Sequence, residues 1–129
     1  MKTILTLFVL LFLTSAVNAE WTKVVESEGG FSIHYFDYDT LKKIKGNVRI
    51  WELVSYPYKL LEDHDVYSAK NLILFDCQNK KFKYLSNVYF NDLKGEGKLL
   101  LSDDTESEWY FDPPGSVGYI ELETVCKFN

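Results

Sequence analysis

Cys77 and Cys126 are the only two cysteines in the chain, and a secretion signal precedes them. One pair allows one connectivity, so an oxidising compartment should join Cys77 to Cys126 in a disulfide. Zinc binding would need cysteine and histidine residues clustered at short spacing, and these two sulfurs stand alone in the sequence. A bridge that closes a loop of about 50 residues contributes roughly 4 kcal/mol, comparable to the whole stability of a small domain. We therefore expect a small fold organised around one covalent cross-link.

The export signal occupies the first nineteen residues. Lys2 provides the positive charge, residues 4–13 are almost entirely apolar, and Val17-Asn18-Ala19 is a small-residue cleavage site. The apolar run is shorter than the roughly 20 residues that span a bilayer. We expect residues 1–19 to be a cleaved signal peptide and residues 20–129 to be one exported domain. The cut offers no cysteine for acylation, so we expect a periplasmic or secreted protein with neither a membrane span nor a lipid anchor, and surface display is left open.

Charge and composition exclude several classes of partner. The formal net charge is −5, whereas a protein built to neutralise nucleic-acid phosphates would carry a basic stripe. The same charge argues against general adhesion to anionic lipid. No internal repeat or low-complexity linker divides residues 20–129, which favours a single domain. We expect no cofactor and no nucleic-acid partner.

Apolar segments separated by turn residues predict an antiparallel sheet. The expected strands cover residues 31–37, 40–45, 48–56, 66–76, 81–90 and 98–101. Near the end of the chain, Pro113-Pro114-Gly115-Ser116 is a helix-start signal with Ser116 as the N-cap, and the apolar spacing that follows predicts one helix carrying Cys126. The expected fold is therefore α+β: about six antiparallel strands in a single sheet, with one C-terminal α-helix packed on one face and held there by the disulfide.

The central strands are apolar on both of their faces. In residues 48–54, Val48, Ile50 and Val54 alternate with Trp51 and Leu53. A sheet with one solvated face should alternate apolar with polar residues, and one short helix covers a single face only. Two explanations stay open at this point: a second copy of the chain covers the other face in a homodimer, or the chain's own loops and sheet curvature cover it.

Residue patterns for catalysis or metal binding are weak. His34 lies inside an expected strand, and His64 lies in the acidic stretch Glu62-Asp63-His64-Asp65, where neighbours in sequence do not converge in space. Residues 103–108 form an acidic loop, and such loops are usually solvent-exposed and bind no ion. No serine lies in a nucleophile-elbow motif, and both cysteines are used by the bridge. We therefore expect a protein that is not an enzyme and has no metal site.

One basic cluster and a high aromatic content suggest where a partner protein would bind. Lys80, Lys81 and Lys83 surround the expected turn after Cys77, and they could contact an acidic or polyanionic partner. The alternative is that these lysines protect the edge of a sheet. Aromatic residues make up 16% of the chain, and Trp51 and Tyr84 are candidates for a binding face, although core packing explains them equally well.

An ordered set of residues runs through nearly all of the exported part: Trp21, Val48-x-Ile50-Trp51-x-Leu53, Tyr67-Ser68-Ala69-Lys70, Phe75-Asp76-Cys77, Gly95-x-Gly97, Trp109, Pro114-Gly115-Ser116 and Val125-Cys126-Lys127. This set, with the two cysteines in place, resembles the surface-adhesin protein E family of bacteria. The resemblance implies a curved antiparallel sheet whose concave side holds the disulfide-tied helix, and often a dimer. Only Cys77 and Cys126 carry a role over from the family.

The function that the resemblance implies is a non-enzymatic, exported binding module for host matrix or serum proteins, with its affinity in a sheet face or in the basic hairpin. Two alternatives belong to other classes. One is a periplasmic inhibitor or accessory protein of an envelope enzyme or complex. The other is a small-molecule carrier that uses the concave face of the sheet.

Overall fold

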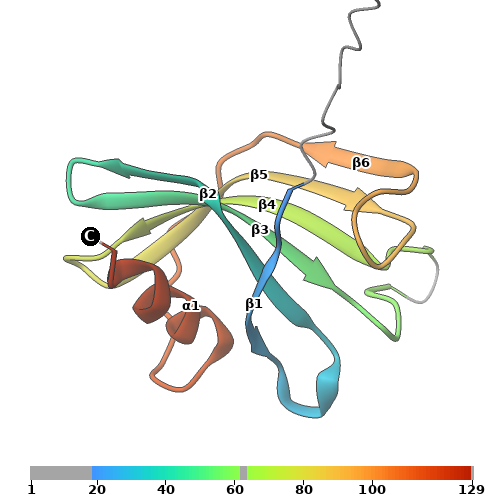
Figure 1. The fold of residues 1–129 in the computed structure, drawn as a ribbon, viewed down its shortest axis with the longest axis horizontal. Coiled ribbons are helices and arrows are strands. Elements are labelled where there is room, and N and C mark those ends of the chain that lie inside the picture. Colours follow the sequence, from blue (N-terminus) through green and yellow to red (C-terminus); the bar gives the residue numbers. More distant parts are fainter. Residues whose placement is uncertain (1–18, 62–63, 129) are drawn as a thin grey trace, which may run out of the picture.

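A computed structural model describes residues 19–61 and 64–128, so most of the expected signal peptide lies outside the described residues. The described chain forms one six-stranded antiparallel sheet in the order β1-β2-β3-β4-β5-β6, with a single α-helix against it (Figure 1). The elements are β1 (Thr22–Glu26), a 3₁₀ turn η1 (Glu28–Gly30), β2 (Ile33–Ile44), β3 (Asn47–Ser55), β4 (Ser68–Asp76), β5 (Lys81–Phe90), β6 (Leu99–Asp103) and α1 (Val117–Cys126). The predicted fold class is confirmed.

Two strand predictions need correction. The segments expected at 31–37 and 40–45 are one strand, β2, which bends where its pairing with β3 breaks between Asp37 and Lys42. Thr40 bridges this bend, because its hydroxyl donates to the carbonyl of Asp37 and accepts from the backbone N–H of Trp51. The sequence reading also missed β1, a five-residue edge strand whose residues are exposed or half-buried and so lack a clear apolar pattern.

The main core lies between α1 and the face of the sheet that it covers. Its buried members come from β2, β3, β4, β5 and α1: Phe36, Val48, Ile50, Ile73, Phe75, Phe82, Leu122 and Val125. The aromatic rings meet edge-on or tilted, with ring centroids 6.0 Å apart for Phe36 and Phe75 and 5.8 Å apart for Phe75 and Phe82. Figure 1 shows the sheet twisting so that β1, at one edge, comes beside α1.

The helix is held at both ends as the sequence predicts. Ser116 is the N-cap, and its hydroxyl accepts a hydrogen bond from the backbone N–H of Tyr119. At the other end, Cys126 is bonded to Cys77, which directly follows β4, with their Cα atoms 5.6 Å apart. The predicted disulfide is confirmed in the structure, and it joins the last turn of α1 to the sheet.

At Gly118, α1 packs closely against the sheet. A Cβ atom built there would lie 2.8 Å from Cζ of Phe82 and would also collide with a carboxylate oxygen of Asp112. In a helix interior, alanine is normally more stabilising than glycine by about 1 kcal/mol. Here we expect the opposite sign: Gly118→Ala should lower the free energy of unfolding by about 1–3 kcal/mol, because overpacking must displace a buried ring. Urea unfolding measures this, and an increase in stability would contradict the packing argument.

Candidate functional site

The sheet has two unlike faces. Side chains of Val48, Ile50 and Glu52 point toward α1, and we call this side the helix face. Side chains at the alternate positions, such as Arg49 and Trp51, point to the opposite side, which we call the outer face. Residues directly paired across antiparallel strands lie on the same face, so the register of the sheet defines what each face carries.

The outer face gathers basic side chains from four strands. One row across it contains Lys42 of β2, Arg49 of β3, Leu74 of β4 and Lys83 of β5. The neighbouring rows are Asp37, Trp51, Leu72 and Ser86, and then Tyr35, Leu53, Lys70 and Val88. In the next row on the other side of the basic row, Lys81 pairs with Asp76. A chain of net charge −5 therefore concentrates cations on one side of its sheet, around half-buried apolar residues.

Lys81 and Lys83 share an aromatic partner. Their Nζ atoms lie 4.4 Å and 4.8 Å from the centroid of the Trp109 ring, and Lys83 also forms a 3.0 Å ion pair with Glu106. Cation–π contacts of this kind contribute about 0.5–1 kcal/mol each at exposed sites. They also fix the direction of two long side chains, so less conformational entropy remains to be lost when a partner binds.

The segment that carries Trp109 also closes the edge of β5. The backbone groups of Phe82 and Tyr110 exchange two hydrogen bonds, and the N–H of Ser107 donates to the carbonyl of Tyr84. This half of β5 is therefore paired on both sides. The alternative reading of the lysines as protection for an open strand edge loses its main support.

Trp51 lines a hollow in the same outer face. The hollow has a volume of about 220 Å³ and is lined by Trp21, Asp37, Thr40, Trp51, Lys70, Val88 and Phe90. Lys70 Nζ lies 5.2 Å from the centroid of the Phe90 ring and 5.8 Å from that of Trp21. The hollow is therefore a mainly apolar depression with a lysine at its wall, next to the basic row.

The chain itself covers part of the outer face. The loop after β5 folds over Leu53, where Gly95 is buried against it and the Ser55 hydroxyl donates to the carbonyl of Leu93. Asp92 holds this loop by accepting backbone hydrogen bonds from Lys94, Glu96 and Gly97. Self-coverage thus explains the buried Leu53, while Trp51, Leu72 and Leu74 stay partly exposed.

The five residues predicted to bind a partner do not form one surface. Lys81, Lys83 and Trp51 lie on the outer face, as described above. Lys80 lies at the tip of the β4–β5 turn in a left-handed conformation, with φ of 52°. Tyr84 lies on the helix face, with its ring 5.8 Å from that of Tyr110. Burial raises the pKa of the Tyr84 phenol well above its usual range, which marks it as part of the packed interior.

Three residues of the outer face, Arg49, Lys70 and Trp109, were not predicted from the sequence as binding residues. Arg49 could have been found, because it alternates with Val48 and Ile50 in a strand that the sequence predicts correctly. Lys70 and Trp109 could not, because their positions depend on how distant strands pair. No local pattern brings Trp109 beside Lys81.

The helix face holds a second cluster, of buried polar groups. Nδ1 of His34 lies 3.0 Å from Glu52 and 3.1 Å from Glu121, and Asn71 donates to the other oxygen of Glu52. Burial, and then the neighbouring Glu52 charge, raise the pKa of Glu121 well above its usual range. Desolvation would also raise the pKa of Glu52, but hydrogen bonds from Glu121, His34 and Asn71 outweigh it and hold that pKa below its usual range. The pKa values of these two neighbouring carboxyl groups are therefore shifted in opposite directions.

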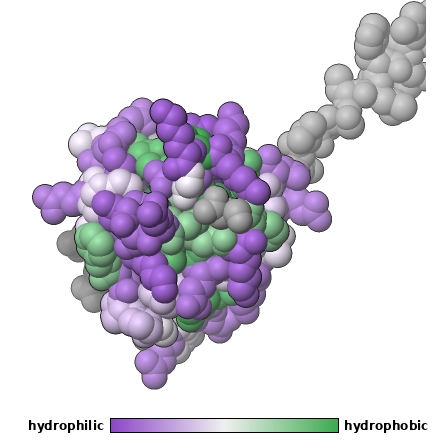
Figure 2. All heavy atoms as spheres, turned by 90° about the vertical axis from the view of Figure 1, so that its left-hand side faces the viewer, coloured by the Kyte–Doolittle hydropathy of each residue, from purple (hydrophilic) through white to green (hydrophobic). Residues whose placement is uncertain are grey.

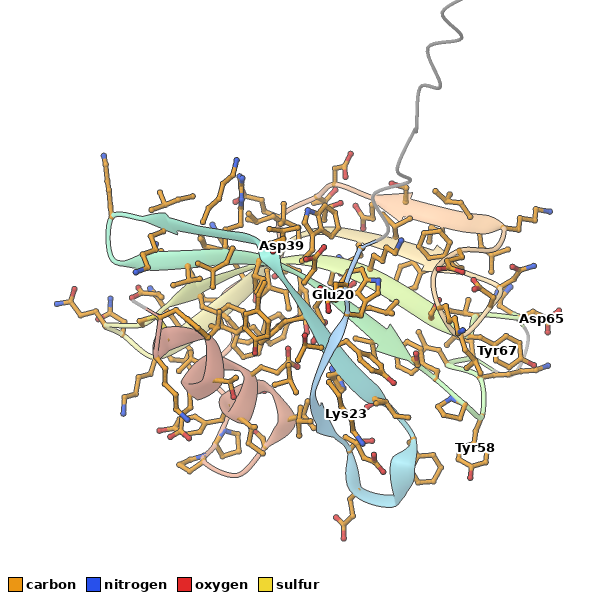
Figure 3. All side chains as sticks on the ribbon, in the orientation of Figure 1. Glu20, Lys23, Asp39, Tyr58, Asp65 and Tyr67 are labelled. Atoms are coloured by element: carbon orange, nitrogen blue, oxygen red, sulfur yellow. A yellow bond between two sulfur atoms is a disulfide. The ribbon has the colours of Figure 1, made fainter. Side chains whose placement is uncertain are left out.

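The other candidates for chemistry are not part of this cluster. Figure 3 shows Tyr58, Asp65 and Tyr67 together at the opposite end of the molecule from α1. There Asp65 pairs with Lys59 at 3.0 Å, and His64 is exposed. Glu62 and Asp63 lie outside the described residues. The acidic loop at residues 103–108 is largely exposed, and its Asp104 and Glu106 contact Ser86 and Lys83 on the neighbouring strand.

The surface near α1 is mainly hydrophilic. Figure 2 views the end of the molecule that carries the β2–β3 hairpin and the helix, and hydrophobic atoms are visible there between charged and polar side chains. In the described ranges 19–61 and 64–128, no helix combines the length and the hydrophobicity needed to cross a bilayer.

Comparison with known proteins gives a consistent answer. The family model described as surface-adhesin protein E matches residues 21–127. Two solved structures of Haemophilus influenzae protein E resemble this fold with TM-scores of 0.63 and 0.59 at 13% and 12% sequence identity. The first match covers 87% of this chain and 91% of the other, and the second covers 88% and 79%. No curated protein matches the chain in sequence.

Proposed function

This chain belongs to the surface-adhesin protein E family, and we propose that it is an exported, non-enzymatic module whose outer face binds an acidic surface of a host matrix or serum protein. The family and the fold make it an adhesin-like module. The choice of face rests on one observation: Lys42, Arg49 and Lys83 lie in a single row, on three of the four strands that the row crosses, in an otherwise acidic protein.

The chemistry of the outer face suits a protein partner. Arginine and tryptophan are enriched among the residues that dominate binding energy, and here Arg49 and Trp51 are neighbours that are only half-buried. The apolar hollow beside them would accept an aromatic or aliphatic side chain. The surrounding lysines would pair with carboxylates and raise the rate of encounter, so binding should weaken as salt is added.

Charge reversal of Lys81→Glu together with Lys83→Glu should weaken binding to matrix or serum proteins at least tenfold. The reason is that two partly ordered cations become like charges facing an acidic partner. Lys80→Glu alone should have a smaller effect, because Lys80 lies at the turn tip rather than on the face. Surface plasmon resonance of the processed, oxidised protein against immobilised matrix and serum proteins measures this.

A matched control carries the same charge change elsewhere. Lys43 and Lys127 are both exposed, and Lys43 pairs with Val48, so it occupies the same hairpin on the other face. The Lys43→Glu, Lys127→Glu double variant should bind like the wild type. Equal loss of binding in both double variants would assign the effect to net charge. Unchanged binding in both would place the contact elsewhere on the molecule.

The cellular location of the protein distinguishes this proposal from the alternative of a periplasmic inhibitor or accessory protein. An adhesin must reach the cell exterior, so protease or antibody added to intact cells should reach the protein. Complete retention in the periplasm would favour an inhibitor or accessory role. A small-molecule carrier is disfavoured, because the concave side under α1 is filled by core residues such as Phe36, Phe75 and Leu122.

A homodimer through the outer face remains a prediction. Trp51, Leu72 and Leu74 leave apolar surface there, but an isologous contact would also bring two identical basic rows together. Light scattering after size exclusion, over a range of protein and salt concentrations, decides between a dimer and a monomer. A monomer at high concentration would exclude the dimer.

A further inference from the structure

Three potential metal ligands converge between the sheet and the helix. His34 comes from β2, Glu52 from β3 and Glu121 from α1, and one ligand atom from each lies within 4.8 Å of the others. Nδ1 of His34 is 3.0 Å from Oε2 of Glu52 and 3.1 Å from Oε1 of Glu121. Ligand atoms about 2.0–2.2 Å from one tetrahedral ion lie slightly farther apart than this, so small side-chain rotations would admit the ion.

Neighbouring polar groups already orient two of the three ligands. Asn71 donates to Oε1 of Glu52 and leaves Oε2 facing His34. The hydroxyl of Ser32 lies 2.8 Å from Nε2 of His34, so Nε2 can donate its proton there and leave the Nδ1 lone pair pointing at the carboxylates. A metal-binding histidine characteristically hydrogen-bonds through its other ring nitrogen in this way.

The third ligand carries an unsatisfied atom. Glu121 is 4% exposed, and its Oε2 has no hydrogen-bond partner among the residues that the structure describes. Its carboxyl group adjoins that of Glu52, which is 1% exposed, so two acidic groups lie together in the buried interior. A buried carboxylate oxygen without a donor is costly, and a bound cation would satisfy it.

We propose that His34, Glu52 and Glu121 form a binding site for a divalent transition-metal ion of the zinc type. One imidazole nitrogen and two carboxylate oxygens are ligands that Zn²⁺ accepts, and a water molecule would complete a tetrahedral set. The side chain of His34 is 13% exposed, which gives the ion a route in from solvent. This site lies on the helix face and is independent of the partner-binding proposal for the outer face.

The consequence of such a site is structural. The disulfide joins the end of α1 to the residue after β4, whereas an ion at Glu121 would join the middle of the helix to β2 and β3. Bound metal would thus fasten α1 at a second point. Because the ion would bind the folded protein only, it should raise the melting temperature as its concentration exceeds the dissociation constant.

The test titrates Zn²⁺ into the processed, oxidised protein after chelator treatment, using a competing chromophoric chelator and thermal melting. We expect one ion per chain, with affinity at least tenfold weaker in His34→Gln and in Glu121→Gln. The chain offers matched controls: His64→Gln changes the other histidine, and Glu123→Gln changes an exposed glutamate two residues along α1. Both controls should bind like the wild type.

Glu121→Gln keeps the test decisive, because glutamine fits the same space and its amide can donate to Glu52, so the variant should fold. Loss of Zn²⁺ affinity in a variant that melts at or above the metal-free wild-type temperature would support the site. No binding to the wild type at millimolar Zn²⁺ would overturn it. Equal binding by Glu121→Gln, or loss of binding in His64→Gln, would overturn it as well.

Discussion

Replacing Cys77 and Cys126 with serine should lower the free energy of unfolding by about 4 kcal/mol. The bridge spans 49 positions in sequence, and closing a loop of that length removes about this much conformational entropy from the unfolded chain. For a domain of this size, the melting temperature should fall on the order of 20 °C. Urea unfolding followed by circular dichroism measures the change.

The helix explains why this loss should be felt across the molecule. α1 has ten residues, fewer than an isolated helix needs to be stable in water. It also supplies Leu122 and Val125 to the core, so fraying of α1 would expose the helix face.

Reduction of the wild-type protein serves as the control. The reduced protein and the serine double variant should unfold at the same denaturant concentration, since both lack the same cross-link. A loss of less than about 1 kcal/mol in both would mean that the unfolded chain is already compact, and the entropic account would fail.

Phe75→Ala should destabilise the protein by about 3–5 kcal/mol, the usual range for removing a buried phenylalanine. The side chain is 1% exposed and lies between the rings of Phe36 and Phe82. Those neighbours belong to β2 and β5 on either side, so the cavity cannot be closed by moving one element. Urea unfolding at constant pH measures the loss.

Phe31→Ala provides the matched comparison. Phe31 is 65% exposed and contacts only the ring of Tyr58 among the aromatic residues that the structure describes. Its replacement should change stability by about 0.5 kcal/mol or less, as is usual for a surface substitution. Similar losses at Phe31 and Phe75 would contradict the assignment of the core to the helix face.

The two proposed sites differ in how many of their residues can be predicted from the sequence. Lys81, Lys83 and Trp51 are identifiable from a local basic cluster and a strand pattern, and they do lie on one face. Tyr84 directly follows Lys83 in β5, and successive residues of a strand point to opposite faces, so Tyr84 lies on the helix face and Lys83 on the outer face. The buried cluster could not be predicted from the sequence. His34 and Glu121 are 87 positions apart, and a glutamate on a helix is ordinarily expected to be exposed to solvent.

The sequence by itself determined the cross-link, because the chain contains only two cysteines. It also determined the helix start at Ser116 and the central strands β3 to β5, because these depend on residue type and on neighbours within a few positions. Tertiary structure alone decided which side chains share a face, because strand register brings together residues from distant parts of the chain. It placed Trp109 under two lysines, merged two expected strands through the bend at Thr40, and directed Glu121 inward against His34 and Glu52. The physical reason is that polar groups gain or lose their partners only when elements pack, and no local pattern encodes that packing.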